Sequence, residues 1–309
     1  MDEIYSIVNN LADVSPIIFL SFGIPGNLMI IYILLQKKFI DISSFRYLLV
    51  SSFVDIGTLV LAFANYNPQY FSYYHERIAC KTFTYTISLV PQISAWIASL
   101  CSFDRLLTVK YSMTSQFRNK LVYQVIAISI IFAVLMVANV PYIMFYDIIT
   151  WRNYSFCAVV TAEQSIIADV IYNTFLTIIP FFIMVITTLM ILYHFIVQNK
   201  KLKNDNKYKK DVAFTKVIFA INLWFLVCNL PYAIVQLTAD FARFQLTDYL
   251  RAVVLLCFSC TSFLTYSYPA FNFFVYFFSN RLFREHFYSL LKLKRNNKNS
   301  KFSYTSATS

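Results

Sequence analysis

The chain alternates between long apolar stretches and short polar segments. Seven stretches contain no Lys, Arg or Glu, and no Asp apart from Asp55 in the second of them. These stretches are Val14–Gln36, Tyr47–His75, Thr82–Phe103, Leu121–Tyr146, Val170–Asn199, Val217–Ala239 and Ala252–Asn280. Each exceeds the roughly 20 residues with which a helix crosses a hydrocarbon core about 30 Å thick. The pattern predicts seven membrane-spanning helices near residues 15–36, 45–66, 80–111, 121–145, 164–198, 212–239 and 249–279.

A shorter amphipathic element follows the seventh stretch. Within residues 280–294, apolar side chains recur at helical spacing and basic side chains lie between them. This pattern predicts a helix on the inner membrane surface. We therefore expect an all-α membrane protein, a seven-helix bundle with no separate soluble domain. Its parts are an extracellular N-terminus (1–14), the transmembrane domain (15–279), the surface helix (280–294) and a cytoplasmic tail (295–309).

Composition and charge support a membrane protein and orient it. The chain is 59% hydrophobic, has a mean hydropathy of +0.59 and carries a net charge of +11. With the N-terminus outside, 21 of the 26 Lys and Arg residues fall in cytoplasmic segments, as the positive-inside rule requires. We expect a multi-pass protein of the plasma membrane. Anionic lipid headgroups account for its basic charge, so nucleic acid is not an expected partner.

Two of the six cysteines fall on the expected outer side. Cys80 opens the third span and Cys157 lies between the fourth and fifth, whereas the other four lie inside spans. An oxidising exterior favours a disulfide between an outer pair. The tripeptide Asn153-Tyr154-Ser155 lies on the same side and predicts glycosylation at Asn153.

Motifs in the first three spans occur at the depths typical of one receptor family. The first span contains Gly26-Asn27, and the second places Asp55 at mid-membrane, where a lone carboxylate is a candidate functional group. In the third span, Arg105 of Asp104-Arg105-Leu106 follows Cys80 by 25 residues. This spacing resembles that between the outer cysteine and the Asp-Arg-Tyr arginine of the rhodopsin-like (class A) G-protein-coupled receptors.

The later spans extend this resemblance over nearly the whole chain. Phe225 to Pro231 is similar to the family's Phe-x-x-Cys-Trp-x-Pro, and Asn272 to Tyr276 is similar to Asn-Pro-x-x-Tyr. Pro180 and Pro141 match the prolines of the fifth and fourth spans. Five positions depart from the family pattern and indicate a divergent member: Leu106, Ile131, Thr188, Asn229 and Phe273.

The resemblance implies roles for specific residues. G-protein coupling and switching are assigned to Asp104, Arg105, Met113, Asp211, Asn272 and Tyr276. Hinge and transmission roles are assigned to Pro180, Phe225, Asn229 and Pro231. A ligand pocket is assigned to Ile87, Gln92, Tyr232, Gln236, Ser262 and Tyr266, although such side chains often serve only helix packing. An Arg105–Asp211 ion pair would hold the inner face closed; alternatively, Asp104 alone pairs with Arg105 and Asp211 caps a helix.

An allosteric sodium ion is the one cofactor that the resemblance suggests. Asp55, Ser94 and Asn272 match three positions of the family's sodium pocket, and their oxygen atoms suit a hard cation. Asn229, Tyr268 and Pro269 replace other members of that shell, so the site is a hypothesis.

The sequence narrows the ligand without naming it. Ile87 stands where amine receptors carry an aspartate, and Tyr266 stands where opsins carry the retinal lysine, which argues against both classes. The outer segments hold nine acidic and five basic residues, which favours a cationic peptide through electrostatic steering.

We therefore expect a receptor that passes a peptide signal to a heterotrimeric G protein. A chemosensory receptor for small molecules is an alternative, favoured by the departures in the sixth and seventh spans. A transporter or channel is a third possibility, but the chain lacks inverted repeats and has few intramembrane charges. Three glycines cannot build a phosphate loop and three scattered histidines have no metal spacing, so an enzyme is not expected.

Overall fold

The computed structural model describes residues 1–40, 42–67, 76–110, 121–151, 154–198, 206–242 and 247–290. Seven helical segments in these ranges are long and apolar enough to cross a membrane, which confirms the predicted fold class. The elements in chain order are α1 (Asp2–Leu34), α2 (Lys37–Ile40), α3 (Ser43–Tyr66), α4 (Arg77–Lys110), α6 (Leu121–Ala138), α7 (Val140–Phe145), β1 (Tyr146–Trp151), β2 (Tyr154–Val159), α8 (Ala162–Asn173), the π-helix η3 (Thr174–Ile178), α9 (Ile179–Gln198), α10 (Asn206–Ala242), α11 (Asp248–Ser279) and α12 (Arg281–Leu290).

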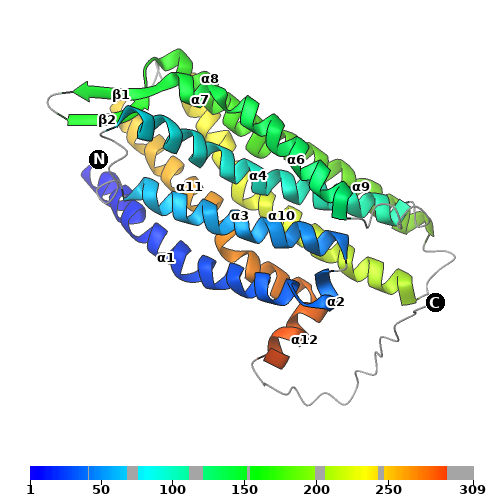
Figure 1. Cartoon of the computed structure of the whole chain (residues 1–309). Helices are drawn as coiled ribbons and strands as arrows, with labels where there is room; N and C mark the ends of the chain where they lie inside the picture. Colours follow the sequence, from blue (N-terminus) through cyan, green and yellow to red (C-terminus); the bar gives the residue numbers. More distant parts are fainter. Residues whose placement is uncertain are drawn as a thin grey trace.

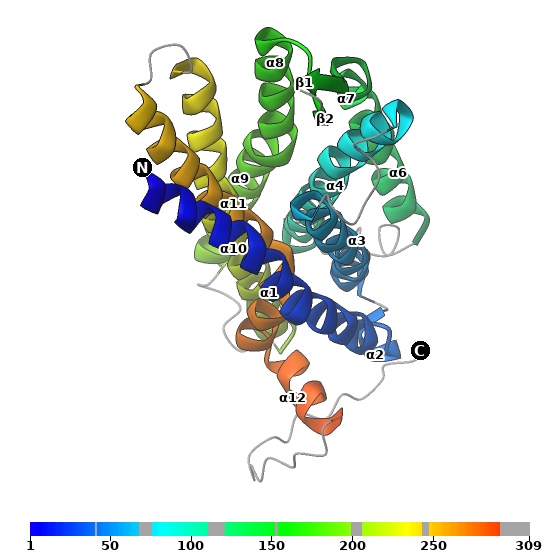
Figure 2. The same ribbon diagram turned by 90° about the vertical axis from the view of Figure 1, so that its left-hand side faces the viewer.

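The long helices run side by side as one bundle (Figure 1). The strands β1 and β2 and the start of α1 lie at one end, here named the hairpin end, and α12 lies at the other, the α12 end. Helix α11 packs between α1 and α10, and α4 packs against α3, α6, α9 and α10. Figure 2 shows α6 and α7 at the edge of the bundle beyond α4. Consistent with this position, only 11% of the most apolar part of the fourth span (Leu121–Phe145) is buried.

Two spans begin more than one helical turn earlier than hydropathy predicts. Helix α1 starts at Asp2 rather than near residue 15, so residues 2–14, predicted as an extracellular N-terminus, are helical. Asp2 and Glu3 occupy its first turn, where negative charge is favourable at a helix N-terminus. Helix α10 likewise begins at Asn206 instead of near residue 212. Hydropathy locates the part of a helix that suits lipid, whereas these polar turns extend the helix beyond it.

Polar side chains and prolines mark irregularities in the fourth and fifth spans. The fourth span is interrupted at Asn139, and Pro141 lies in the first turn of α7, where a missing N–H costs nothing. The fifth span contains the π-helix η3 just before Pro180. The indole Nε1 of Trp96 donates a hydrogen bond of 2.8 Å to the carbonyl of Phe175 in that π-helix. A partner from α4 thus satisfies a carbonyl where the regular helical pattern changes.

The segment between the fourth and fifth spans forms an antiparallel hairpin, for which no strand was predicted. Strands β1 and β2 pair from Tyr146 opposite Val159 to Trp151 opposite Tyr154. The pairing places Ile148 directly opposite Cys157. The hairpin therefore holds Cys157 at a defined position over the start of α4.

The absence of a side chain at Gly23 allows α1, α3 and α11 to pack closely. A Cβ atom at this position would lie 2.3 Å from Leu59 Cδ1 and 3.0 Å from Ala270 Cα. Both neighbours are 1% exposed, and the second contact is with backbone. Alanine here cannot be accommodated by moving one flexible side chain, so α11 itself would have to shift.

We expect Gly23→Ala to lower the free energy of unfolding by about 1–3 kcal/mol, the usual cost of overpacking. Gly57→Ala is the matched control, because its Cβ would lie 3.7 Å from Val90 Cγ1, an ordinary contact. Thermal unfolding of the purified variants in one detergent measures the difference. Equal melting temperatures for the two variants would contradict the close packing at Gly23.

Candidate functional site

A carboxylate lies in the middle of the bundle and is bonded from two other helices. Asp55 of α3 is 1% exposed. Ser94 Oγ of α4 donates to Asp55 Oδ1 at 2.6 Å, and Asn272 Nδ2 of α11 donates to Asp55 Oδ2 at 2.8 Å. Ser51 Oγ lies 3.2 Å from Ser94 Oγ. Of the three residues predicted to form a cation site, Ser94 and Asn272 are therefore both in contact with Asp55.

A small cavity adjoins this group on the side toward the hairpin end. Its volume is about 20 Å³, and its walls include Asp55, Ser94, Asn229 and Tyr266. A space of this size holds roughly one water molecule or one small ion. It is too small to hold an amino-acid side chain.

The donor set beside this cavity fits a small hard cation. Both Asp55 oxygens and the Ser94 hydroxyl are oxygen ligands of the kind that such ions prefer. The Oδ1 atom of Asn272 is buried and accepts no hydrogen bond from the part of the chain that the structure describes. A rotation of this amide would add a further oxygen ligand.

At the α12 end, polar contacts from α3 hold the acidic residue of the Asp104-Arg105 pair. Ser43 Oγ donates to Asp104 Oδ2 at 2.5 Å, and Ser44 Oγ donates to the same atom at 3.4 Å. Gln124 Nε2 of α6 donates to the carbonyl of Ser43 at 2.8 Å. Asp104 and Arg105 are 4% and 5% exposed. The pair is thus positioned by three helices rather than by α4 alone.

Two of the predicted switch residues cannot be placed. Met113 and the side chain of Asp211 lie outside the described residues. The Arg105–Asp211 pair therefore stays a prediction, as does the alternative in which Asp104 alone pairs with Arg105.

A second polar connection joins three helices close to Arg105. Ser102 Oγ of α4 donates to Asn222 Oδ1 of α10 at 3.0 Å. Asn222 Nδ2 in turn donates to Thr188 Oγ1 of α9 at 3.3 Å. Thr188 is one of the five positions that depart from the family pattern, and here its hydroxyl contributes to a polar link between helices.

The hinge and transmission residues lie in the apolar interior. Phe225 is completely buried, and its ring centroid lies 5.3 Å from that of Tyr268. Asn229 Nδ2 donates to the carbonyl of Phe225 at 2.9 Å, in the helical turn that precedes Pro231. Tyr276 is 4% exposed and its ring lies 6.1 Å from that of Phe283, which links α11 to α12.

Two of the predicted pocket residues, Gln92 and Gln236, form hydrogen bonds to neighbouring helices. Gln92 is fully buried, and its amide exchanges two hydrogen bonds of 3.1 and 2.7 Å with the amide of Asn139. It therefore faces the interruption in the fourth span. Gln236 accepts a hydrogen bond from Asn173 at 3.0 Å and donates one to Asp169 at 2.6 Å. These contacts connect α10 to α8.

Of the remaining pocket candidates, Tyr232 and Tyr266 have aromatic neighbours. Tyr266 lines the small cavity, and Tyr232 packs against Tyr172 and Phe258 with ring centroids 6.4 and 5.3 Å away. Ser262 is buried and Ile87 is half-buried. Aromatic side chains therefore dominate the wall between the cavity and the hairpin end.

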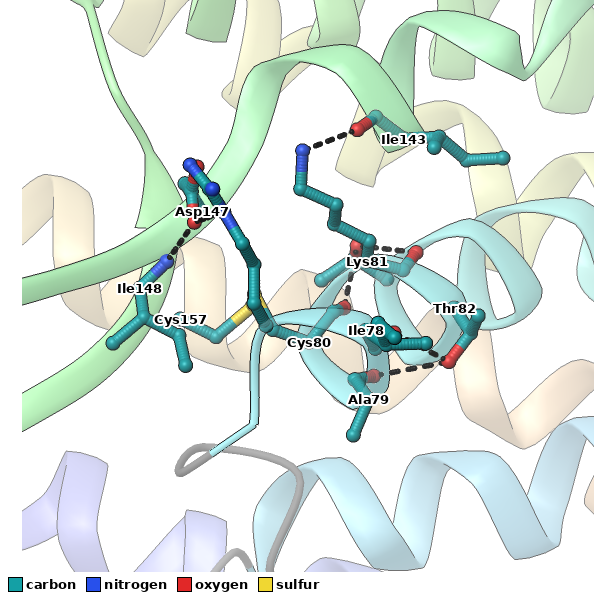
Figure 3. Close-up of a disulfide and its surroundings, with 11 residues drawn as sticks. Ile78, Ala79, Cys80, Lys81, Thr82, Ile143, Asp147, Ile148 and Cys157 are labelled. Carbon is teal, nitrogen blue, oxygen red and sulfur yellow. Dashed lines mark hydrogen bonds and ion pairs between the residues drawn. A yellow bond between two sulfur atoms is a disulfide. The ribbon is translucent and has the colours of Figure 1, made fainter.

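A disulfide fastens the hairpin to α4. Cys80 and Cys157 are bonded, which confirms the predicted pair, and their Cα atoms are 5.6 Å apart (Figure 3). Cys80 is completely buried. The bond closes a 77-residue separation in sequence and fixes the hairpin over the start of α4. Asn153, the predicted glycosylation site, lies outside the described residues.

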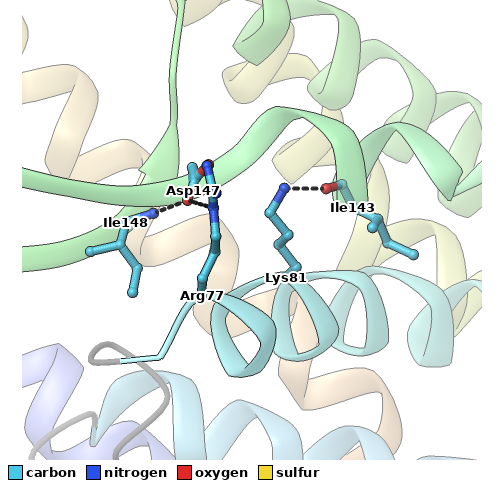
Figure 4. A network of polar contacts seen from close by, with 5 residues as sticks. All are labelled: Arg77, Lys81, Ile143, Asp147 and Ile148. Atoms are coloured by element: carbon cyan, nitrogen blue, oxygen red, sulfur yellow. Dashed lines mark hydrogen bonds and ion pairs between the residues drawn. The ribbon is translucent and has the colours of Figure 1, made fainter.

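Two polar contacts from α4 lie beside the disulfide, one to the hairpin and one to α7. Arg77 Nε donates to both carboxylate oxygens of Asp147, at 2.8 and 2.9 Å, and Lys81 Nζ donates to the carbonyl of Ile143 at 3.0 Å (Figure 4). The bond from Arg77, helped by the backbone N–H of Ile148, lowers the pKa of Asp147 to about 2. Asp147 is therefore ionised throughout the physiological pH range. Because both partners are partly solvated, the contact orients the hairpin more than it stabilises it.

Several polar contacts were not assigned from the sequence, although their residues were visible in it. Ser51, Asn139 and Asn222 all lie within apolar spans. A polar side chain in such a span normally finds a hydrogen-bond partner on a neighbouring helix. That rule identifies these residues as contact-forming, but it does not identify their partners.

Comparisons with known proteins agree with this architecture. The model of the family described as 7 transmembrane receptor (rhodopsin family) matches residues 26–276. Galanin receptor 2b of Danio rerio is 25% identical over 181 residues, which cover 57% of this chain but only 47% of that receptor. C-C chemokine receptor type 4 of Homo sapiens is 24% identical over 298 residues, covering 89% of this chain and 76% of that receptor.

Proposed function

Because the chain belongs to the rhodopsin family of seven-transmembrane receptors, we propose that it transmits the binding of an extracellular peptide to a heterotrimeric G protein. The observation that carries this proposal is the buried Asp104–Arg105 pair, which contacts from α3 position at the α12 end of the bundle. A ligand that favours one arrangement of the helices would change how this end is presented to a G protein. Neither ligand binding nor the change in helix arrangement requires a covalent bond to be broken.

The peptide class of ligand rests on the named relatives and on charge. One relative is a receptor for galanin and the other is a receptor for C-C chemokines. The excess of acidic residues in the segments at the hairpin end favours a cationic peptide. The aromatic wall formed by Tyr172, Tyr232 and Tyr266 offers apolar contact area between these segments and the small cavity.

The proposed orientation places the N-terminus and the hairpin end outside the plasma membrane. The bias of Lys and Arg toward the opposite segments supports it. The disulfide at the hairpin end supports it as well, because such bonds persist on the oxidising side of a membrane.

A nucleotide-exchange screen tests the proposal. The full chain is reconstituted in lipid nanodiscs with each class of G protein and exposed to cationic and acidic peptide libraries and to small molecules. We expect exchange to be stimulated by one or more cationic peptides. Stimulation by small molecules alone would replace the peptide receptor with a chemosensory one, and no exchange with any G protein under any condition would overturn G-protein coupling.

We propose in addition that Asp55, Ser94 and Asn272 bind a sodium ion. Their oxygen atoms and the cavity of about 20 Å³ support this proposal. We expect the melting temperature of the purified receptor to be higher in sodium chloride than in choline chloride of equal ionic strength, because an ion that binds the folded state stabilises it. Asp55→Asn, which removes the charge and keeps the size of the side chain, should abolish the difference. Equal melting temperatures of the unaltered chain in the two salts would count against the site.

A further inference from the structure

The side chains of Ser102, Asn222 and Thr188 form a continuous polar connection across α4, α10 and α9, here named the clasp. The bond from Ser102 Oγ to Asn222 Oδ1 measures 3.0 Å, and that from Asn222 Nδ2 to Thr188 Oγ1 measures 3.3 Å. Ser102 is completely buried and Asn222 is 4% exposed. The amide of Asn222 thus uses both of its ends, one toward each neighbouring helix.

The clasp is a polar layer within an otherwise apolar interface. On the α12 side of Asn222, Ile218 and Ile221 of α10 belong to one buried apolar cluster, which also contains Cys101 of α4. Toward the hairpin end, Ala98 of α4 belongs to a second cluster with Phe225 of α10. Asn222 lies between Ile221 and Phe225 in sequence, so along α10 a polar residue separates two apolar groups that belong to clusters with α4.

The clasp lies close to Arg105, toward the α12 end of the bundle. Ser102 precedes Arg105 by three residues, which is about one turn of helix. The clasp therefore joins α4 to α10 next to the residue that we propose to couple to the G protein. Any separation of α10 from α4 at this level must break the bond between Ser102 and Asn222.

The cost of breaking the clasp falls mainly on Asn222. Ser102 Oγ also lies 3.0 Å from the carbonyl of Ala98 in its own helix, so its hydroxyl has a partner whether or not α10 is close. Asn222 has only inter-helix partners among the hydrogen bonds of the described residues. An amide left without partners in apolar surroundings is unfavourable, whereas apolar side chains can slide past one another with little change in contact.

We propose that the clasp is a latch that favours the closed arrangement of the α12 end in the absence of ligand. This inference rests on the proposed function and specifies how the same site is regulated. Release of Asn222 from Ser102 and Thr188 accompanies the separation of α10 from α4 that exposes Arg105 to a G protein. The polar residue at position 188, which departs from the family pattern, serves this chain as one end of the latch.

The latch predicts that removing the amide shifts the equilibrium toward the open arrangement. We expect Asn222→Leu to raise ligand-independent nucleotide exchange about three- to tenfold, the change that corresponds to one or two inter-helix hydrogen bonds in a membrane. Ser102→Ala and Thr188→Val each remove one bond and should give smaller increases. These two milder variants decide the question if Asn222→Leu does not fold.

The neighbouring helical turns supply matched controls. Ser99 is 2% exposed and its hydroxyl donates to the carbonyl of Ala95 in its own helix at 3.0 Å. Thr187 is 3% exposed and donates to the carbonyl of Ile183 in its own helix at 2.7 Å. Ser99→Ala and Thr187→Val remove the same chemical groups without cutting a link between helices. Both should leave basal exchange unchanged.

A distance measurement separates the latch from G-protein coupling. The exposed Cys257 and Cys260 are first replaced by serine, and spin labels are attached at Lys216→Cys on α10 and Tyr123→Cys on α6. The distance between the two labels is measured by double electron–electron resonance in nanodiscs without a G protein. We expect Asn222→Leu to add a population of longer distances and the two controls to match the unaltered chain. Longer distances without exchange by any G protein would keep the latch and overturn the proposed function. Unchanged distances in all three clasp variants would overturn the latch.

Discussion

Replacement of Cys80 by serine is expected to remove most of the folded receptor from the cell surface and to lower its melting temperature by roughly 10 °C. The disulfide closes a separation of 77 residues, for which chain entropy gives about 4 kcal/mol. This value is an upper figure, because a bilayer already restricts the unfolded chain by keeping its helices inserted. Without the bond, Arg77 still contacts Asp147 of the hairpin and Lys81 still contacts Ile143 of α7, but both contacts are exposed to solvent.

Further variants test whether loss of the disulfide causes these effects. Cys157→Ser should match Cys80→Ser, and the double variant should be no worse than either single variant, because each of them lacks the same disulfide. Cys257→Ser is the control, since Cys257 is an exposed free cysteine. Surface expression by antibody labelling and thermal unfolding of purified protein measure the effect. Additive losses in the double variant would show that the two cysteines act separately.

Replacement of Arg105 by alanine is expected to reduce G-protein nucleotide exchange to the level of receptor-free membranes. Arg105 is 5% exposed at the α12 end, beside an aspartate that Ser43 and Ser44 hold in place. The guanidinium of Arg105 combines a permanent charge with a planar set of donors, which suits it to contact a partner protein. Its removal takes away the group that we propose to contact the G protein, while Asp104 keeps its bonds to α3.

The measurement is made in the Asn222→Leu background, where basal exchange is expected to be raised and no ligand is needed. Lys110→Ala removes one positive charge from the exposed end of the same helix and serves as the control. Surface expression of both variants should stay close to that of the parent. Retention of exchange in Arg105→Ala would show that this arginine is not the coupling group.

The contacts of the polar residues show where sequence reasoning stops. The family resemblance assigned Gln92 to the ligand pocket, and in the structure its amide exchanges two hydrogen bonds with Asn139 at an interruption in the fourth span. A family pattern relates the helices of Asp55, Ser94 and Asn272, and Asp55 is hydrogen-bonded to each of the other two, whereas their cation site stays a prediction. No comparable pattern relates Ser102, Asn222 and Thr188, so their contact emerged only from the packed bundle.

The sequence by itself determined the seven spans, the class of fold and the Cys80–Cys157 pair. It could do so because the cost of placing charge in hydrocarbon acts on each segment separately, and because the motif spacings lie within single helices. The tertiary structure alone decided where α1 begins, that residues 146–159 form a hairpin, and which polar side chains meet across helices. These features depend on how helices rotate and slide against one another, and in a bundle whose surface and interior are both apolar, hydrophobicity cannot specify that arrangement.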